Sequence, residues 1–270
     1  MITILGKKYK IYQDNVVLTD LLDGLKKISN IFSLHGLSDE NTCSIYTFCM
    51  ESIVFAENLE KLSCGASEVV LLPGIMLIID QKLRLVVMFV DRTLNIKREL
   101  VLLLPYISNF IFQDEIMVFH GAAIKCLNNN SNVALFLGES GAGKTTISNL
   151  AFHDDLSILS DELNFVFFDK KTLSFWVQSA GIYSEDALFH AESEAFPLSL
   201  FVELKKGCTT TIENLSPTNM LALLDSNEIS YPKSFKIDYL YFSIISNIPF
   251  IRMEFSKHTV DWHMLDVLVT

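Results

Sequence analysis

A glycine-rich segment near the middle of the chain has the residue types and the spacing of a phosphate-binding loop. Residues 138–145 read GESGAGKT and fit the pattern G-x-x-x-x-G-K-[ST]. Glycines let the backbone turn sharply and direct its N–H groups toward an anion. Lys144 supplies a positive charge for the outer phosphates, and the hydroxyl of Thr145 can bind Mg²⁺. The segment therefore predicts a bound nucleoside triphosphate, which we expect to be ATP, together with Mg²⁺.

The elements on either side of this loop are those that the motif requires. Residues 133–137 are apolar, as in a buried strand, and residues 146–150 predict a helix whose N-terminal dipole favours an anion. Glu139, inside the loop, is placed to approach the metal or a bound water. The predicted nucleotide-binding residues are Gly138, Glu139, Ser140, Gly141, Ala142, Gly143, Lys144, Thr145 and Thr146.

An acidic pair follows the loop closely in the sequence. We expect the helix after the loop to run to about Phe152 and a strand over Leu156–Leu159, which ends at Ser160-Asp161-Glu162. Ordinary P-loop ATPases commonly place their second carboxylate much further along the chain. The short return predicts that Asp161 and Glu162 lie at the carboxyl edge of the sheet, where phosphate sites occur in open α/β folds. Two acids beside a phosphate repel it unless Mg²⁺ is present, so we expect metal dependence.

A histidine lies within the apolar run that precedes the loop. The run IMVFHGAAIKCL, residues 116–127, predicts a strand, and the asparagine-rich residues 128–132 predict a turn. If this strand pairs with residues 133–137 as a hairpin, His120 comes close to the loop. Without the surrounding motifs, a histidine on an apolar strand would be interpreted as a satisfied core or edge residue.

The order HGAAIK, LFLGESGAGKTT, ILSDE resembles the HPr kinase/phosphorylase family and its short relatives. The resemblance covers roughly residues 115–170 and extends more weakly to FPLSLFVELKKG. It implies an α/β fold similar to the nucleotide-binding part of phosphoenolpyruvate carboxykinase, a mixed sheet with flanking helices, here preceded by a β-rich N-terminal region. By position, the resemblance implies Asp161 as general base, Glu162 as its acidic neighbour near the metal and His120 beside the pair. The implied catalytic residues are Asp161, His120, Glu162 and Lys144, and the implied metal ligands are Thr145, Glu162 and Asp161.

The resemblance implies a kinase that transfers the γ-phosphate of ATP to a hydroxyl. The expected acceptor is a serine of a peptide or small protein, with free serine as an alternative. The longer family members carry a signature with glycine and arginine, used for the reverse, phosphate-removing reaction and for assembly. We do not find it in this sequence, and residues 181–197 contain neither Arg nor Lys. This difference argues against the reverse reaction and against HPr itself as substrate, without deciding whether a reverse activity exists.

Two other functions are compatible with a phosphate-binding loop. A nucleotide-gated binding module would use the loop as a switch without phosphotransfer. A carboxykinase-like enzyme would act on a small carboxylic acid and would need clustered arginines for its acceptor. The chain has only four, which argues against this function; they are Arg84, Arg92, Arg98 and Arg252.

Composition limits the partners. The chain has 270 residues and a formal net charge of −11, without a clustered basic face, so we expect no nucleic-acid partner. The most apolar stretch, residues 100–112, is too short to span a membrane, and the start lacks a secretory signal. Five cysteines without C-x-x-C spacing predict reduced core thiols and a cytoplasmic protein. The sequence allows a homo-oligomer.

Two regions are predicted. Residues 1–92 carry short apolar or alternating runs and form a β-rich N-terminal region with one helix over Leu18–Ile31. Residues 93–270 form the P-loop kinase core, which begins with a helix over 93–113 interrupted near Pro105.

The expectations for single residues outside the site are a hairpin turn at Asp169, an exposed strand end at Lys205-Lys206-Gly207, a structural ion pair for Arg252 and a core position for Trp262.

Overall fold

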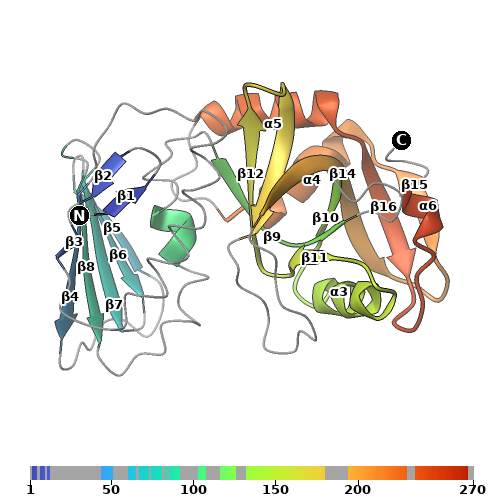
Figure 1. Ribbon diagram of the computed structural model, residues 1–270, viewed down its shortest axis with the longest axis horizontal. Helices are drawn as coiled ribbons and strands as arrows, with labels where there is room; N and C mark the ends of the chain where they lie inside the picture. The colour runs from blue at the N-terminus through green and yellow to red at the C-terminus, as the bar shows by residue number, and fades with distance from the viewer. Residues whose placement is uncertain are drawn as a thin grey trace. The chain divides into compact units, whose positions relative to one another are not determined.

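The computed structural model divides the chain into two compact units, Met1–Gln113 and Asp114–Thr270, which are described separately (Figure 1). The two units meet after Gln113, whereas the sequence predicts a boundary after Arg92, between the β-rich region and the P-loop core. The predicted boundary stays a prediction. The structure describes residues 2–4, 7–9, 11–12, 44–50, 60–64, 67–72, 74–80, 83, 85–91, 103–107, 116–125, 132–179, 194–229 and 235–266.

The first unit is β-rich, as its short apolar runs predict. Its main sheet has six strands in the order β3-β4-β8-β7-β6-β5, and β1 pairs with β2 in a separate hairpin. Side chains alternate along β7, where Ile75, Leu77 and Ile79 are buried and the residues between them are half-buried. The strands are β1 (Ile2–Ile4), β2 (Lys7–Tyr9), β3 (Ile11–Tyr12), β4 (Ser44–Met50), β5 (Glu60–Cys64), β6 (Ser67–Leu72), β7 (Ile75–Asp80) and β8 (Leu85–Asp91).

Residues 103–107 form a helical segment around Pro105, with Leu103, Leu104 and Ile107 buried. A proline is tolerated in the first turn of a helix, where its missing N–H has no partner to lose. The rest of the helix predicted over 93–113, and the helix predicted over Leu18–Ile31, lie outside the described residues. Among the described residues, no helix is long and apolar enough to cross a membrane.

The second unit is built on a curled mixed sheet of eight strands, which confirms the mixed α/β class. Strand β10 pairs antiparallel with β9 and parallel with β14, so the sheet closes on itself around the order β10-β9-β12-β13-β14. The hairpin predicted between β9 and β10 is present. The strands are β9 (Ile116–Lys125), β10 (Val133–Leu137), β11 (Ile158–Ser160), β12 (Leu163–Asp169), β13 (Ser174–Ser179), β14 (Ala195–Lys206), β15 (Thr211–Asn214) and β16 (Phe250–Phe255).

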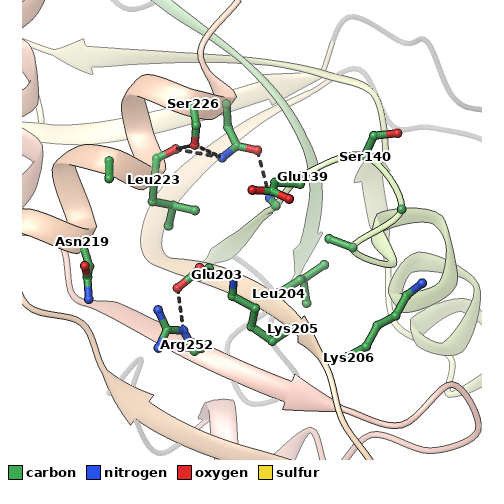
Figure 2. A pocket seen from close by; sticks show the side chains of 15 residues that line it. Glu139, Ser140, Glu203, Leu204, Lys205, Lys206, Asn219, Leu223, Ser226 and Arg252 are labelled. Carbon is green, nitrogen blue, oxygen red and sulfur yellow. Dashed lines mark hydrogen bonds and ion pairs between the residues drawn. The ribbon is translucent and has the colours of Figure 1, made fainter.

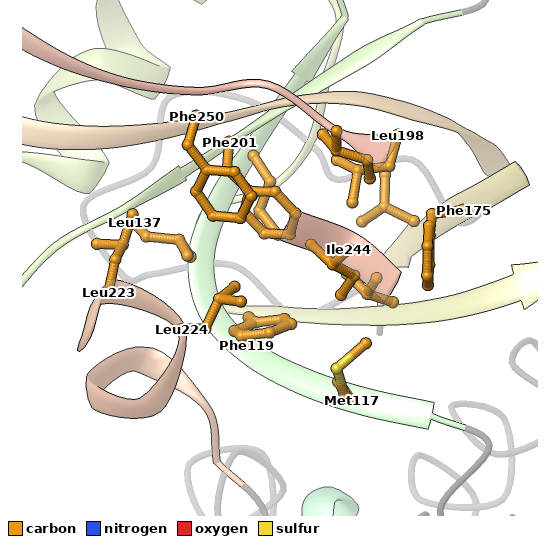
Figure 3. Close-up of a cluster of buried hydrophobic side chains, with 14 of the residues drawn as sticks. Met117, Phe119, Leu137, Phe175, Leu198, Phe201, Leu223, Leu224, Ile244 and Phe250 are labelled. Atoms are coloured by element: carbon orange, nitrogen blue, oxygen red, sulfur yellow. The ribbon is translucent and has the colours of Figure 1, made fainter. Parts of the chain in front are cut away.

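Helices cover both faces of this sheet. The helices are α3 (Lys144–His153), α4 (Pro217–Asn227), α5 (Phe235–Asn247) and α6 (His263–Asp266). On one face, Leu224 of α4 and Ile244 of α5 pack against the stacked rings of Phe201 and Phe250, whose centroids lie 4.6 Å apart (Figure 3). On the other face, α3 and Trp262 pack against the alternate strand positions. The period of two along each strand separates these two apolar clusters.

Strand β9 lies between β10 and β12, and its pairings with these two strands meet in its middle, at the His-Gly pair. His120 lies opposite Leu163 of β12, whereas Gly121 lies opposite Leu137 of β10. A Cβ atom on Gly121 would lie 2.7 Å from Leu137 Cδ2 and 2.8 Å from the carbonyl oxygen of Phe136. Glycine is therefore required because the strands approach too closely here for any side chain, and this close approach brings His120 to the end of β10.

Substituting Gly121→Ala should destabilise the second unit. The added methyl group overpacks a fully buried position, a change that typically costs about 1–3 kcal/mol. We expect a lower urea midpoint with an unchanged denaturant dependence, measured by far-UV circular dichroism. Ala123→Ser, two residues further along the same strand, adds one atom without this backbone approach and should cost less. An equal cost at both positions would contradict the close-packing explanation.

Ser216 caps α4 by accepting a hydrogen bond from the N–H of Asn219. The predictions for Asp169 and Trp262 are confirmed. Asp169 closes the β12–β13 hairpin turn, accepting from the N–H of Lys171 and the hydroxyl of Thr172. Trp262 is buried, and its indole N–H donates to Asp154 Oδ2 at 2.7 Å. The prediction of core thiols is wrong for Cys208, because this free thiol is exposed.

Candidate phosphate-binding site

The glycine-rich segment forms a loop between the end of β10 and the start of α3, as predicted. Gly141 and Gly143 have φ angles of 78° and 109°, in the left-handed region that favours glycine. A Cβ atom on Gly143 would also lie 2.7 Å from the ring of Phe255, at the end of β16. The loop therefore needs glycine at position 143 for both its backbone conformation and its packing.

The side chain of Lys144 lies beneath this loop. The residue is only 8% exposed, and Nζ donates hydrogen bonds to the carbonyl oxygens of Gly138 at 2.8 Å and Glu139 at 3.2 Å. Burial lowers the pKa of the Lys144 ammonium, and the nearby negative charge of Glu162 opposes this shift. Lys144 and Glu162 are therefore close enough to interact electrostatically, although they lie on different elements.

The acidic pair lies at the same edge of the sheet as the loop. Strands β10 and β11 both pair antiparallel with β9, so they run parallel to each other and end at the same edge. Glu162 Oε2 lies 3.2 Å from His120 Nε2, and the N–H of Gly121 donates to the carbonyl oxygen of Glu162 at 3.0 Å. The structure therefore brings His120, Glu162 and the loop lysine together.

Asp161 is placed differently from its neighbour. It is 1% exposed, whereas the side chains of Glu162 and His120 are 22% and 41% exposed. The turn that carries both acids is held by Ser160, whose Oγ accepts a hydrogen bond from the N–H of Glu162 at 3.0 Å. Glu162 thus faces the solvent side of the site, and Asp161 lies in the protein interior.

The remaining loop residues lie in two environments. Glu139, Ser140 and Gly141 form the exposed turn of the loop, whereas Ala142 is half-buried and packs on the α3 face of the sheet. Thr145 and Thr146 are half-buried in the first turn of α3. These two threonines line a cavity of about 380 Å³ together with Asn149, Leu150, His153 and Lys257.

Asn227 is a site residue that the sequence did not indicate. Its Oδ1 accepts a hydrogen bond from the N–H of Gly138, the first residue of the loop, at 3.0 Å. Its Nδ2 donates to the carbonyl oxygen of Leu223 at 2.8 Å and to Ser226 Oγ at 3.0 Å. Asn227 therefore connects the last turn of α4 to the entry of the loop. No motif marks this residue, because the contact joins segments that are distant in the chain.

Replacing Asn227 should weaken both the fold and the loop. In Asn227→Ala the buried N–H of Gly138 loses its partner, which costs about 1–3 kcal/mol of unfolding free energy. Ser226→Ala is the matched control, since it removes a partner of Asn227 but leaves Gly138 satisfied. We expect it to cost roughly 0.5 kcal/mol or less. Chemical denaturation measures both, and an equal loss in the two variants would contradict the assignment.

A second cavity, of about 510 Å³, opens between the loop, the end of β14 and helix α4 (Figure 2). Arg252 lines this cavity, and the ion pair predicted for Arg252 is present. Its Nε lies 2.7 Å from Glu203 Oε2, and one terminal nitrogen lies 2.6 Å from Glu213 Oε1. The hydrogen bond to Glu203 is the main cause of a raised pKa for Arg252. Lys205 and Lys206 end β14 beside the loop.

The residues at the loop fit Mg²⁺ bound together with a nucleotide. Among the described residues, no group of three or more His, Cys, Asp or Glu side chains could hold a metal ion by itself. Mg²⁺ commonly takes one or two protein ligands, several waters and the phosphates of a nucleotide. A threonine at the start of α3 and the partly exposed carboxylate of Glu162 are ligands of this kind, and a buried lysine accompanies them.

Likeness to known proteins is found among solved structures. No protein-family model and no curated protein matches the sequence. Among solved structures, the chain is similar to the Hpr(Ser) kinase/phosphatase from Coxiella burnetii. The identity is 12%, the match covers 56% of this chain and 87% of that chain, and the TM-score is 0.26. A TM-score this low does not establish a shared fold or activity.

Proposed function

We propose that the protein is an ATP- and Mg²⁺-dependent kinase that transfers the γ-phosphate to a hydroxyl acceptor, with Asp161 as general base. The observation that supports it best is the common edge of β9, β10 and β11. There the loop with its buried lysine lies beside the pair of Glu162 and His120, and the carboxylate of Glu162 interacts electrostatically with that lysine. A loop that only binds nucleotide does not require this second group of charges.

The loop residues would bind and orient the polyphosphate. Phosphoryl transfer depends mostly on positioning and on neutralising charge. The N–H groups of the exposed turn can donate to phosphate oxygens. In the structure, Lys144 donates hydrogen bonds to two backbone carbonyl oxygens of the loop. Phosphate oxygens are stronger acceptors, and in the nucleotide complex they would take the place of these carbonyl oxygens. A bound phosphate would also hold the lysine in its charged form, because it counteracts the effect of burial on the lysine pKa.

The acidic pair would serve the acceptor and the metal. Mg²⁺, when bound, neutralises charge on the phosphates. Thr145 and Glu162 would hold it, with Asp161 close by, and the imidazole of His120 orients Glu162. Asp161 would accept the proton of the acceptor hydroxyl, a role that a carboxylate shielded from water can perform. Asp161 is 1% exposed, and in this proposal the acceptor would approach it from the side of the partly exposed Glu162 and His120.

The acceptor that we propose is a serine on a peptide or small protein, in the cytoplasm. A carboxykinase-like reaction is disfavoured because Arg252, which lines the cavity of about 510 Å³, is already paired with Glu203 and Glu213. Free serine is the alternative acceptor. A binding module in which the nucleotide acts only as a switch is the alternative that lacks chemistry.

The test uses γ-labelled ATP with the purified full-length protein. The acceptor panel contains free serine, serine-containing peptides encoded beside this protein, and HPr. Reactions run with Mg²⁺ and with excess chelator, and products are separated by electrophoresis and chromatography. We expect Mg²⁺-dependent label on a peptide serine. Label on free serine would select the alternative acceptor.

Free phosphate alone, or no product despite measurable ATP binding, would overturn phosphotransfer to this panel and favour the switch. Capture of partners with and without ATP distinguishes these cases, because a switch binds its partner only in one nucleotide state. A kinase instead releases a phosphorylated product. Absence of any ATP binding would remove both functions.

A further inference from the structure

We propose that Lys206, at the end of β14, is a second cation for the bound polyphosphate and acts together with Lys144. This inference rests on the proposed function and names one more residue of the same site. Lys206 lies far from the loop motif in the chain. It ends the segment FPLSLFVELKK, where the resemblance is weaker and where the sequence predicted only an exposed strand end. Three features of its position support the role: strand register, the face of the sheet and the absence of a competing partner.

Strand register brings Lys206 to the level of the loop. Strands β10 and β14 run parallel, and their last pair joins Leu137 to Glu203. Strand β14 then continues for three more residues while β10 gives way to the loop. The loop starts directly beside this extension, since a Cβ atom on Gly138 would lie 3.5 Å from the carbonyl oxygen of Leu204. Lys206 therefore lies alongside the loop.

The face of the sheet directs Lys206 toward the start of α3. Alternate residues of a strand share a face, so Lys206 shares the face of Leu204, which packs in the apolar cluster that contains α3 residues. Its parallel partner is Phe255, the residue whose ring approaches Gly143 immediately before α3. In Figure 2 the Lys206 side chain extends toward the pale green α3 and away from Arg252. The start of this helix is where backbone N–H groups and the helix dipole favour phosphate.

The two lysines at the end of β14 differ in their pairing. Lys205 is on the opposite face, and its Nζ lies 3.0 Å from Glu203 Oε1. Lys206 lines the cavity of about 510 Å³, and its ammonium group makes no hydrogen bond or ion pair with any described residue. An ammonium group already paired with a carboxylate has little attraction left for phosphate, whereas an unpaired one keeps its full charge. Within the part of the chain that the structure describes, Lys206 is thus an unpaired cation, and Lys205 next to it is a matched control.

A second cation also fits the charge balance of the site. The acidic pair adds negative charge beside the loop, and the chain as a whole has a net charge of −11. A single buried lysine leaves part of the triphosphate charge uncompensated even when Mg²⁺ is present. A charged group that contacts only the outer phosphates should stabilise ATP more than AMP, because AMP lacks those phosphates.

The test is calorimetric titration of the full-length protein with ATP and ADP in the presence of Mg²⁺, and with AMP, at constant ionic strength. Lys206→Met should weaken ATP binding about ten-fold or more, as expected for loss of one charge-assisted contact. AMP binding should change by no more than about two-fold, a difference of well under 1 kcal/mol. Lys206→Arg should retain most of the ATP affinity, because the charge is kept. Lys205→Met should remain within about two-fold of the unmodified chain, as its charge is already paired.

Equal ATP affinity in Lys206→Met and the unmodified chain would overturn this inference while leaving the proposed function in place, provided that Lys144→Met loses ATP binding. Equal losses for ATP and AMP, or for Lys205→Met and Lys206→Met, would also overturn it, since they indicate a structural or general electrostatic effect. If the unmodified chain binds no ATP, the proposed function fails and the inference fails with it.

Discussion

Asp161→Asn should abolish phosphotransfer while leaving ATP affinity almost unchanged. The substitution keeps the size and shape of the side chain but removes its ability to accept a proton. General base catalysis typically contributes about 10²–10⁴-fold to a rate, and we expect a loss in this range. The dissociation constant for ATP should stay within about two-fold, because the loop and Lys144 make the phosphate contacts. Single-turnover transfer of label to the acceptor, with calorimetry in parallel, measures both quantities.

Asp169→Asn provides the matched control for this variant. Asp169 is also 1% exposed and lies at the opposite end of the β12 segment, in the hairpin turn. The same chemical change there should lower stability and leave transfer in the folded fraction intact. If Asp161→Asn retains the full transfer rate, Asp161 is not the base. If it loses ATP binding to the same extent as transfer, its role is structural.

Lys144→Met should have the largest effect on nucleotide binding. It removes the buried charge at the centre of the loop, and we expect ATP affinity to fall about 100-fold or more, since contacts to charged groups are the strong ones. The stabilisation of the fold by ATP should disappear as well, because it depends on the ratio of ligand concentration to dissociation constant. Thermal unfolding with and without ATP and Mg²⁺ measures this directly. Lys171→Met, in the exposed β12–β13 turn, is the control.

Without nucleotide, Lys144→Met should not lower stability at neutral pH. Burial lowers the pKa of Lys144 in the folded chain, so the unfolded chain binds this proton more strongly. Between the lowered pKa and the ordinary lysine pKa, the unmodified protein therefore gains stability as pH rises. The methionine variant lacks this contribution. A fall in the nucleotide-free unfolding free energy well beyond about 1 kcal/mol would show that the two hydrogen bonds of Lys144 outweigh the cost of its burial.

The sequence by itself determined the local elements of the site. The spacing of Gly138, Gly143 and Lys144 predicted the strand–loop–helix unit, because only a few backbone geometries suit such a run of glycines. The runs around His120 and Ser160 predicted the strands that return to the same edge, and their pairings are present. Alternation of apolar residues predicted the β-rich N-terminal region, since the period of two is a local property. The functional roles of Asp161 and Glu162 stay predictions.

Only the tertiary structure decided which distant residues surround the loop. Asn227 reaches Gly138 because α4 packs on one face of the sheet, and Lys206 passes the loop because β14 pairs in parallel with β10 and is longer. No local pattern marks Asn227, and the pattern around Lys206 predicted only an exposed strand end. The positions of both residues beside the loop depend on strand order and register. Arg252 is a further example. The sequence predicted an ion pair for it, but the partner, Glu203, follows from the register of β14 and β16. Parallel pairing joins segments far apart in the chain, and local sequence patterns carry little information about it.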